Sequence, residues 1–338
     1  MTVVHGLFLL VLAVAAVLRL GFLDALPLSS EEARQALAVW EIWQAEEVAQ
    51  STAPVSPAYF TLSAILSAFF GASDAMARLA PALFGVIFVA LPWLWRARLG
   101  TAGAMAVSML LAVSPTMTMT SATAGGDSMA LVAALLLFIA WMRFRAAPGK
   151  QWLLVAAVAL GLGLATAPLF YSALLTLTVA WGAQRVLTPS DEESHSGDGV
   201  GISPSQRRRF LVVFAVTFLL IATCFLWRPA GLGNAAGQLG LWMMHFDVTA
   251  GLQALILPLL ALGRYELVVV GVGAAAIFWA AWRGLPLPLF LVYWFASALL
   301  LTLLQQGALY NTVLLVLPSY LLIGLWIRHA TRLPAGDV

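Results

Sequence analysis

Three short stretches hold the side chains whose types and spacing best fit acid–base chemistry. The first is SSEEARQALAVW, where Glu31 and Glu32 are adjacent. Neighbouring carboxylates raise each other's pKa, and one of the two can then serve as a general base. A structural interpretation competes with this one, because acidic residues also stabilise the first turn of a helix through its dipole.

Asp127 is the carboxylate of the second stretch, SATAGGDSMALVAALLL, at the start of a long apolar run. A charge costs about 2.5–3.5 kcal/mol at the centre of a bilayer and less at its edge. Gly125 and Gly126 precede it and let a backbone or a ligand approach closely. Asp127 is therefore a candidate site residue, although a place in the first turn of a helix accounts for it equally well.

The third stretch is the expected loop 229–253, which is polar among aromatic and Met residues. Within it, His245 and Asp247 are suited to contact a sugar or a phosphate. A lone His in such a loop is more often simply interfacial. Arg78 and Arg264 are the basic residues best placed for a phosphate, because a guanidinium can donate two parallel hydrogen bonds to it.

Metal and nucleotide sites are not predicted. Cys224 is the only cysteine, and His195 lies in a Ser/Gly/Asp-rich stretch without a second metal ligand at suitable spacing. The sequence contains no P-loop, dinucleotide fingerprint, HExxH or GxSxG pattern. The net charge is only +2 and the basic residues are dispersed. Nucleic-acid-binding proteins cluster such residues, so no nucleic-acid partner is expected.

The composition is that of an integral membrane protein. Of the 338 residues, 62% are hydrophobic and 9% are charged, whereas soluble domains carry about 25% charged residues. The apolar runs have the length of transmembrane helices rather than of barrel strands. We expect an all-α integral membrane fold with about ten transmembrane helices. The expected spans are 3–22, 78–95, 103–120, 128–142, 151–167, 169–185, 210–227, 265–282, 286–303 and 311–327.

The distribution of Lys and Arg predicts the orientation of the chain. If the stretch 56–70 lies in the membrane interface without crossing, most basic residues fall on one side of the membrane. Cytoplasmic loops carry an excess of Lys and Arg, so this side is expected to be the cytoplasmic one. We therefore expect a multi-pass protein of the plasma (inner) membrane with both termini cytoplasmic. The residues on the expected cytoplasmic side are Arg96, Arg98, Arg143, Arg145, Lys150, Arg185, Arg207, Arg208, Arg209, Arg283, Arg328 and Arg332.

The chain divides into three expected parts. Residues 1–187 form a transmembrane module whose first outer loop spans 23–77. Residues 188–209 read as a disordered cytoplasmic linker, because they are polar, Ser/Gly-rich and without periodicity. Residues 210–338 supply the remaining helices and the outer loop 229–253. In the first outer loop we expect an amphipathic interfacial helix that starts at Ser29 or Ser30 and carries Ala33, Leu37, Trp40 and Trp43 at helical spacing.

The order of these features resembles the GT-C superfamily of membrane glycosyltransferases. It is most similar to the branch of protein mannosyltransferases and bacterial lipid A aminoarabinose transferases. The resemblance covers residues 1–185 well and 240–327 more weakly. It rests on SSEEARQALAVW, PVSPAYFTLSAILSAFFGASDAMARLAPALFGV, SPTMTMTSATAGGDSMALVAALLL, WLLVAAVALGLGLATAPLFY and LWMMHFDVTAGLQALILPLLALGRYE.

The resemblance implies that the chain moves a sugar from a polyprenyl-phosphate donor to an extracytoplasmic acceptor hydroxyl. The family's general base, an acidic residue of the first outer loop, falls on Glu31 with Glu32 beside it. The second acidic position of the family falls on Asp127. Arg78, in ARLAPAL, would hold the lipid phosphate, and Tyr59, in PVSPAYF, would contribute to substrate binding. The implied partners are the lipid bilayer and the lipid-linked sugar.

The sequence also departs from the family, and two other functions stay open. Relatives often have an Asp-Glu pair preceded by His, where this chain has Glu-Glu after two serines, and a basic residue before the second acid, where this chain has glycines. One alternative is a scaffold with the same fold that has lost catalysis and serves as a subunit of a membrane complex. A transporter is less favoured, because the expected span interiors hold essentially no ionisable residues.

Overall fold

The computed structural model describes residues 3–21, 23–43, 55–147, 149–188, 203–246, 252–305 and 308–331. All regular secondary structure in these ranges is helical, which confirms the expected all-α class. The elements are α1 (Val3–Leu20), α2 (Ser30–Trp40), η1 (Glu41–Trp43), α3 (Pro57–Phe70), α4 (Asp74–Leu94), α5 (Arg96–Val113), α6 (Pro115–Ala122), α7 (Asp127–Ala146), α8 (Lys150–Leu164), α9 (Pro168–Leu187), α10 (Pro204–Ala222), α11 (Gly231–Met244), α12 (Leu252–Tyr265), η3 (Val269–Gly273), α13 (Ala274–Arg283), α14 (Pro286–Leu304), η4 (Leu309–Thr312) and α15 (Val313–Ala330).

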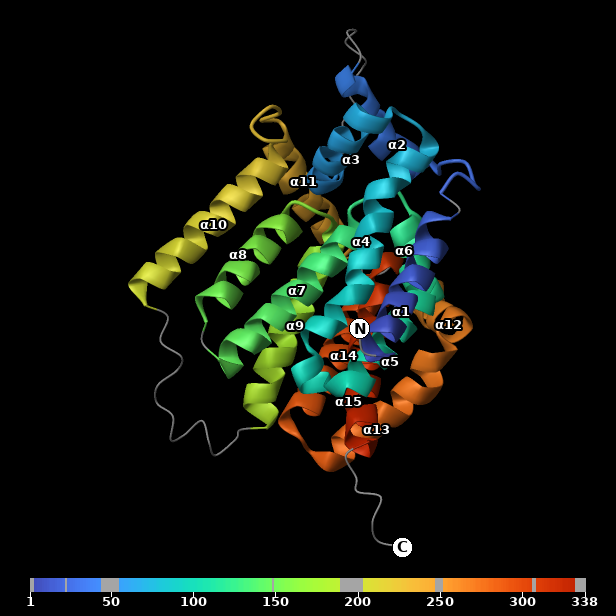
Figure 1. The fold of residues 1–338 in the computed structure, drawn as a ribbon, viewed down its shortest axis with the longest axis vertical. Coiled ribbons are helices and arrows are strands. Elements are labelled where there is room, and N and C mark those ends of the chain that lie inside the picture. The colour runs from blue at the N-terminus through green and yellow to red at the C-terminus, as the bar shows by residue number, and fades with distance from the viewer. Residues whose placement is uncertain are drawn as a thin grey trace, which may run out of the picture.

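Each expected span overlaps a helix or a broken pair of helices. By length and composition, five described helices can cross a membrane, or up to seven if each broken pair counts as one span. The single helices are α1, α4, α7, α14 and α15 with the end of η4, and the pairs are α5 with α6 and α12 with η3–α13. The helices α8, α9 and α10 do not meet these criteria but pack alongside the others, α8 between α7 and α10 (Figure 1).

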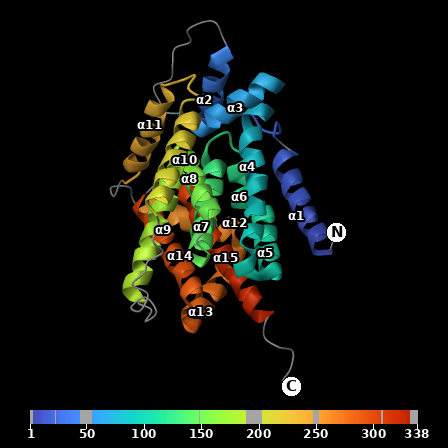
Figure 2. The same ribbon diagram turned by 60° about the vertical axis from the view of Figure 1, so that its left-hand side comes forward.

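The bundle has two chemically different ends. Helices α2 and α3 cover one of them, here called the α2 end, and α3 lies across it (Figure 2). With 14 residues, α3 is about 21 Å long, too short for a hydrocarbon core of about 30 Å. This length is consistent with the expectation that 56–70 does not cross. The opposite end, here called the arginine end, carries basic residues at the helix termini, including Arg96, Arg143, Arg145, Arg185, Arg283 and Arg328.

Helix α10 begins at Pro204, earlier than the expected 210. Ser203 Oγ accepts a hydrogen bond from the Gln206 N–H (3.3 Å), and the Ser203 N–H donates to Gln206 Oε1 (2.9 Å). This capping box, with proline at the first helical position, starts the helix. The expected linker boundary at 209 is therefore wrong, since 204–209 are helical. Residues 189–202 lie outside the described residues.

Two helix breaks meet at Glu266. Helices α5 and α6 are bent by 59°, and α12 and the η3–α13 helix by 105°. The buried Glu266 carboxylate accepts hydrogen bonds from Ser114 Oγ (2.5 Å), the Thr116 N–H (3.1 Å) and Tyr320 Oη (2.6 Å). One carboxylate thus closes the N-terminus of α6, where a negative charge is favourable, and ties both breaks to α15.

Arg19 satisfies the other side of the first break. Pro115 has no N–H to donate to the Leu111 carbonyl, and the Thr116 N–H is used by Glu266. The carbonyls of residues 111 and 112 instead accept from the Arg19 guanidinium, at 2.8 and 3.1 Å. Arg19 is only 1% exposed, so this cation serves helix-terminal carbonyls inside the protein and not the solvent.

Helices α5 and α15 approach each other closely at a pair of glycines. A Cβ on Gly103 would collide with the Gly324 carbonyl, and a Cβ on Gly324 would lie 3.1 Å from the Gly103 carbonyl oxygen. Small residues at a crossing let two membrane helices pack backbone to backbone. The contact holds the buried α15 against α5, whose far end is the break at Pro115.

We expect Gly103→Ala to lower the melting temperature of the detergent-solubilised protein, because overpacking costs about 1–3 kcal/mol. The matched control is Gly182→Ala in α9, where an added Cβ meets nothing within 4 Å. The control should leave the temperature unchanged or raise it, because alanine is about 0.5–1 kcal/mol better than glycine inside a helix. Equal melting temperatures for the two variants would contradict the close packing.

Candidate active site

The first turn of α2 sends its two carboxylates in different directions. The Glu32 N–H donates to Ser29 Oγ (3.4 Å), and the Ser29 N–H donates to Glu32 Oε2 (2.9 Å). This capping box confirms Ser29 as the N-cap. Glu32 is 6% exposed and points into the protein, whereas the Glu31 side chain is 65% exposed.

Glu32 joins three segments that are far apart in the sequence. Its carboxylate accepts two hydrogen bonds from Arg78 of α4, from Nε at 2.8 Å and from Nη2 at 3.0 Å. It also accepts one from the Ala124 N–H, at 3.0 Å, in the connection between α6 and α7. With the Ser29 contact, Glu32 clamps α2 onto both α4 and the start of α7.

The bound donors keep Glu32 ionised. Burial raises the pKa of the Glu32 carboxyl, but hydrogen bonds from Arg78, Ser29 and Ala124 outweigh burial and hold the pKa at about 2. A carboxylate with so low a pKa and so many donors is a poor proton acceptor. These contacts suit a positioning role for Glu32, and its expected part in catalysis stays a prediction.

Arg78 spends all of its donors on the protein. Besides Glu32, its guanidinium donates to the carbonyls of Leu23 (2.9 Å), Leu26 (2.7 Å) and Pro27 (3.2 Å). A guanidinium has five N–H groups, and all five are engaged in this structure. In the structure Arg78 anchors the connection between α1 and α2. The phosphate contact expected of Arg78 stays a prediction.

The connection between α6 and α7 is held on its other side by α3 and α8. Gly126 lies so close to Ser56 and Thr166 that an added Cβ would collide with Ser56 Oγ. The Ser56 N–H donates to Gln35 Oε1 of α2 at 3.1 Å. Only glycine permits this approach at 126, and the packing fixes the backbone directly before Asp127.

Glu31 and Asp127 lie at the same α2 end because of these anchors. The two carboxylates lie within range of each other's charge, although 96 residues separate them in the sequence (127 − 31). Asp127 is half-buried at the first position of α7. The Glu31 carboxylate forms an ion pair with Arg34 and accepts from Gln35 Nε2 at 3.2 Å. The site therefore offers one carboxylate paired with a cation and a second one beside it.

Tyr310 and His245 also lie in the neighbourhood of Asp127. Tyr310 is within range of the Asp127 charge, and its buried hydroxyl has no hydrogen-bond partner among the described residues. The His245 ring packs edge-on against the Tyr310 ring with centroids 5.5 Å apart. His245 Nδ1 is 2.7 Å from the Leu241 carbonyl. A polar row thus runs from Glu31 through Asp127 and Tyr310 to His245.

A network around Gln305 fixes this second half of the row. Gln305 Oε1 accepts from Asn311 Nδ2 (2.8 Å) and from Ser172 Oγ (3.2 Å). Gln305 Nε2 donates to the Trp242 carbonyl (3.2 Å), and Trp242 Nε1 donates to Ser172 Oγ (2.9 Å). The network joins α9, α11 and η4, the elements that carry or adjoin His245 and Tyr310.

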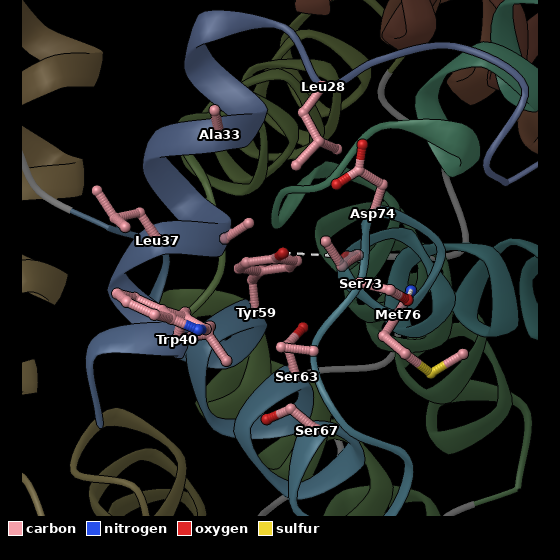
Figure 3. Close-up of a pocket in the computed structure, with 14 residues that line it drawn as sticks. Leu28, Ala33, Leu37, Trp40, Tyr59, Ser63, Ser67, Ser73, Asp74 and Met76 are labelled. Carbon is pink, nitrogen blue, oxygen red and sulfur yellow. Dashed lines mark hydrogen bonds between the residues drawn. The ribbon is translucent and has the colours of Figure 1, made fainter. Parts of the chain in front are cut away.

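Tyr59 belongs to a separate cavity behind α2. Its side chain is fully buried and its hydroxyl donates to the Ala77 carbonyl at 3.0 Å; burial raises its pKa. The cavity has a volume of about 300 Å³ and lies between α2, α3 and the start of α4. Leu37 and Trp40 of the expected amphipathic face are among its lining residues, although the Leu37 side chain points away from the Tyr59 ring in Figure 3. This side of α2 is apolar and faces away from the carboxylates.

Arg264 and Asp247 are the two remaining expected residues. Arg264 is exposed at the end of α12, with its guanidinium over the Tyr265 ring at 5.7 Å from the centroid. Asp247 lies outside the described residues. Among the residues that the structure describes, no group of three or more His, Cys, Asp or Glu side chains is arranged to hold a metal ion.

Sequence reasoning missed Arg34 and Gln35 as site residues and left Tyr310 unassigned. The spacing of Glu31, Arg34 and Gln35 places them on one helix face, a signal that could have revealed the first two. Tyr310 had no such signal, because only tertiary packing brings it to Asp127.

Comparisons with known proteins identify the fold. Residues 53–188 match the family model of dolichyl-phosphate-mannose-protein mannosyltransferases. No curated protein matches the sequence. Similar solved structures include ArnT from Cupriavidus metallidurans in the apo state (TM-score 0.70, 16% identity, 98% of this chain and 61% of ArnT). The same protein bound to undecaprenyl phosphate gives a TM-score of 0.69 at 16% identity, over 97% of this chain and 61% of ArnT.

A second similar protein is the oligosaccharyltransferase AglB from Archaeoglobus fulgidus, in complex with an inhibitory peptide and a dolichol-phosphate. It gives a TM-score of 0.59 at 12% identity, over 99% of this chain and 52% of AglB. The chain thus spans about three fifths of the length of ArnT and half of that of AglB. At these identities the likeness concerns the fold alone. The chain has the fold that ArnT and AglB share, as the resemblance seen in the sequence predicted.

Proposed function

We propose that this chain transfers a sugar from a polyprenyl-phosphate carrier to an acceptor hydroxyl at the extracytoplasmic face of the membrane. The observation that carries the proposal is the hydrogen bond from the Ala124 N–H to Glu32, which brings Glu31 and Asp127, from distant parts of the sequence, to one end of the bundle. Similar proteins bind lipid phosphates: ArnT was solved with undecaprenyl phosphate and AglB with a dolichol-phosphate. In the proposal the α2 end lies at the level of the lipid head groups, where the phosphate of such a donor would be.

The proposed orientation follows from charge. The basic residues at the helix termini gather at the arginine end, and cytoplasmic segments of membrane proteins carry such an excess. The α2 end, with its carboxylates, then faces the extracytoplasmic side. This assignment places the polar row on the side that the sequence predicted for the site.

The proposed reaction needs one proton acceptor and one partner for phosphate. The acceptor oxygen attacks the anomeric carbon, the bond from that carbon to the phosphate oxygen breaks, and polyprenyl phosphate leaves with its electron pair. The hydroxyl proton passes to a carboxylate, and attack opposite the leaving group inverts the anomeric carbon. Removing the proton during attack makes the hydroxyl a stronger nucleophile.

The hydrogen bonds favour Asp127 over Glu31 as the proton acceptor. Glu31 was expected to be the base, but its oxygens are occupied by Arg34 and Gln35. No hydrogen bond to the Asp127 carboxylate is found among the described residues, so its oxygens are the more accessible to a substrate hydroxyl. In the proposal Glu31 orients Arg34, whose guanidinium can offset a phosphate charge, and Tyr310 can donate to the substrate.

A scaffold without catalysis is the second candidate, and a specific observation favours it. Arg78 has no N–H left for a phosphate. If the Glu31–Arg34 pair also stays closed, neither Arg34 nor Arg78 is ready to bind the phosphate of the donor. Such a protein would keep the fold and its contacts with other membrane proteins but would not turn over.

The test is turnover of a defined donor. Purified protein in liposomes containing membrane lipid extract as the source of acceptor is incubated with undecaprenyl-phosphate mannose or undecaprenyl-phosphate aminoarabinose. Release of undecaprenyl phosphate is followed by mass spectrometry. We expect release from one donor, and none from the same preparation of the Glu31→Gln/Asp127→Asn double variant. No release from either donor, with a stable complex to another membrane protein, would support the scaffold instead.

A further inference from the structure

A second cavity opens at the arginine end, far from the carboxylates. Its volume is about 500 Å³, and it lies between the start of α5 and the ends of α7 and α9, with the turn between α13 and α14 closing it. Three arginines line it: Arg98, Arg145 and Arg185. Among the described residues, no carboxylate lines the cavity, so its charge is strongly positive.

Trp95 gives the cavity an unused hydrogen-bond donor. The side chain is 1% exposed and lines the cavity, yet its indole N–H has no partner among the described residues. A buried donor without an acceptor costs about 1–3 kcal/mol. An anionic oxygen bound in the cavity would accept this hydrogen bond and remove the cost. The unused donor therefore indicates a ligand, which positive charge on a surface does not by itself indicate.

Apolar side chains line the cavity together with the arginines. Met142, Leu287 and Phe290 line it together with the Trp181 ring. The Arg185 guanidinium stacks on Trp181, 4.0 Å from the ring centroid. Stacking occupies the face of a guanidinium and leaves its N–H edge for an oxyanion. The combination of cationic and apolar lining residues fits an amphiphile better than a soluble anion.

We propose that this cavity binds the phosphate head group of an anionic phospholipid, with the acyl chains lying along the apolar wall. Basic pockets between transmembrane helices on the cytoplasmic side are known to bind such head groups. The assignment to the cytoplasmic leaflet rests on the orientation given under the proposed function. The binding itself does not, since it depends only on the cavity and can be measured without any sugar donor.

The test compares lipid binding by native mass spectrometry of the detergent-purified protein. The probes are palmitoyl-oleoyl phosphatidylglycerol, the zwitterionic palmitoyl-oleoyl phosphatidylcholine, and inorganic phosphate. We expect phosphatidylglycerol to bind preferentially. Arg98→Gln, Arg145→Gln and Arg185→Gln should each weaken it about fivefold. Trp95→Phe, which keeps a ring and removes only the donor, should weaken it by about as much.

The matched control is Arg96→Gln. Arg96 carries the same charge at the same end, but it lies over the Trp93 ring and outside the cavity. It should change phosphatidylglycerol binding less than twofold. An equal loss in Arg96→Gln, or no loss in the three cavity variants, would overturn the proposal, since binding would then follow net charge. Inorganic phosphate binding as tightly as the lipid would also overturn it.

The chain's own acidic stretch 191–193 is the competing occupant. It follows α9 in the sequence and lies outside the described residues. If wild-type protein shows no lipid preference while the Asp191→Asn/Glu192→Gln/Glu193→Gln variant does, the protein segment occupies the cavity and the lipid assignment is wrong. Sugar transfer that persists in all of these variants would leave the proposed function standing whichever occupant is found.

Discussion

Asp127→Asn is expected to slow sugar transfer by about 10²- to 10⁴-fold, the range that a general base contributes. The amide keeps the shape and the place at the start of α7 but cannot take up the hydroxyl proton. Glu31→Gln is expected to cost only about tenfold, the value of a lost orienting hydrogen bond. The order of the two effects decides which carboxylate is the base.

The measurement is the initial rate of undecaprenyl phosphate release at saturating donor, for the two variants and for Asp24→Asn. Asp24 is an exposed carboxylate between α1 and α2 at the same end and serves as the control. Its variant should keep the wild-type rate. A larger loss in Glu31→Gln than in Asp127→Asn would return the base to Glu31, as the sequence alone suggested. Wild-type rates in both variants would remove the proposed mechanism.

The sequence predicted those parts of the fold that depend on local pattern. Apolar runs long enough to cross a bilayer predicted the helices. A serine at 29 or 30 followed by acidic residues predicted the start of α2. The capping box at Ser203 was equally local, yet it was overlooked inside a Ser/Gly-rich stretch that reads as disordered. Local sequence signals therefore predicted the helix starts correctly where they were recognised.

The contacts that build the site are not local. Arg78 could serve as a phosphate ligand or as a buried anchor. Its position in the sequence fits both roles equally well. Only tertiary structure shows that Glu32, 46 residues away, takes two of its donors. The break at Pro115 was invisible for the same reason, because its stabilising carboxylate, Glu266, is 150 residues from Thr116. Position along the chain predicted which residues lie at the same end of the helix bundle. It did not predict which of them form hydrogen bonds or ion pairs with one another.

Glu32→Gln is expected to be the most destabilising change at the α2 end. Removing one partner of a buried ion pair costs about 3–5 kcal/mol, because the other charge stays buried without compensation. Here the Arg78 guanidinium is the charge left behind, and it is only 6% exposed. The Ala124 contact weakens with it, so the start of α7 should loosen as well.

The adjacent exposed pair supplies the control for this prediction. Arg34→Gln breaks the ion pair to Glu31 two positions along the same helix, where the Glu31 side chain is 65% exposed. Exposed pairs contribute about 0–1 kcal/mol, so the melting temperature in detergent should fall clearly for Glu32→Gln and barely for Arg34→Gln. Equal, small shifts would mean that the clamp does not hold α2 in place. If Glu32→Gln is destabilised as expected, cysteine labelling at Ala124→Cys should also become faster in it than in the unmodified background, since the same carboxylate fixes that backbone next to Asp127.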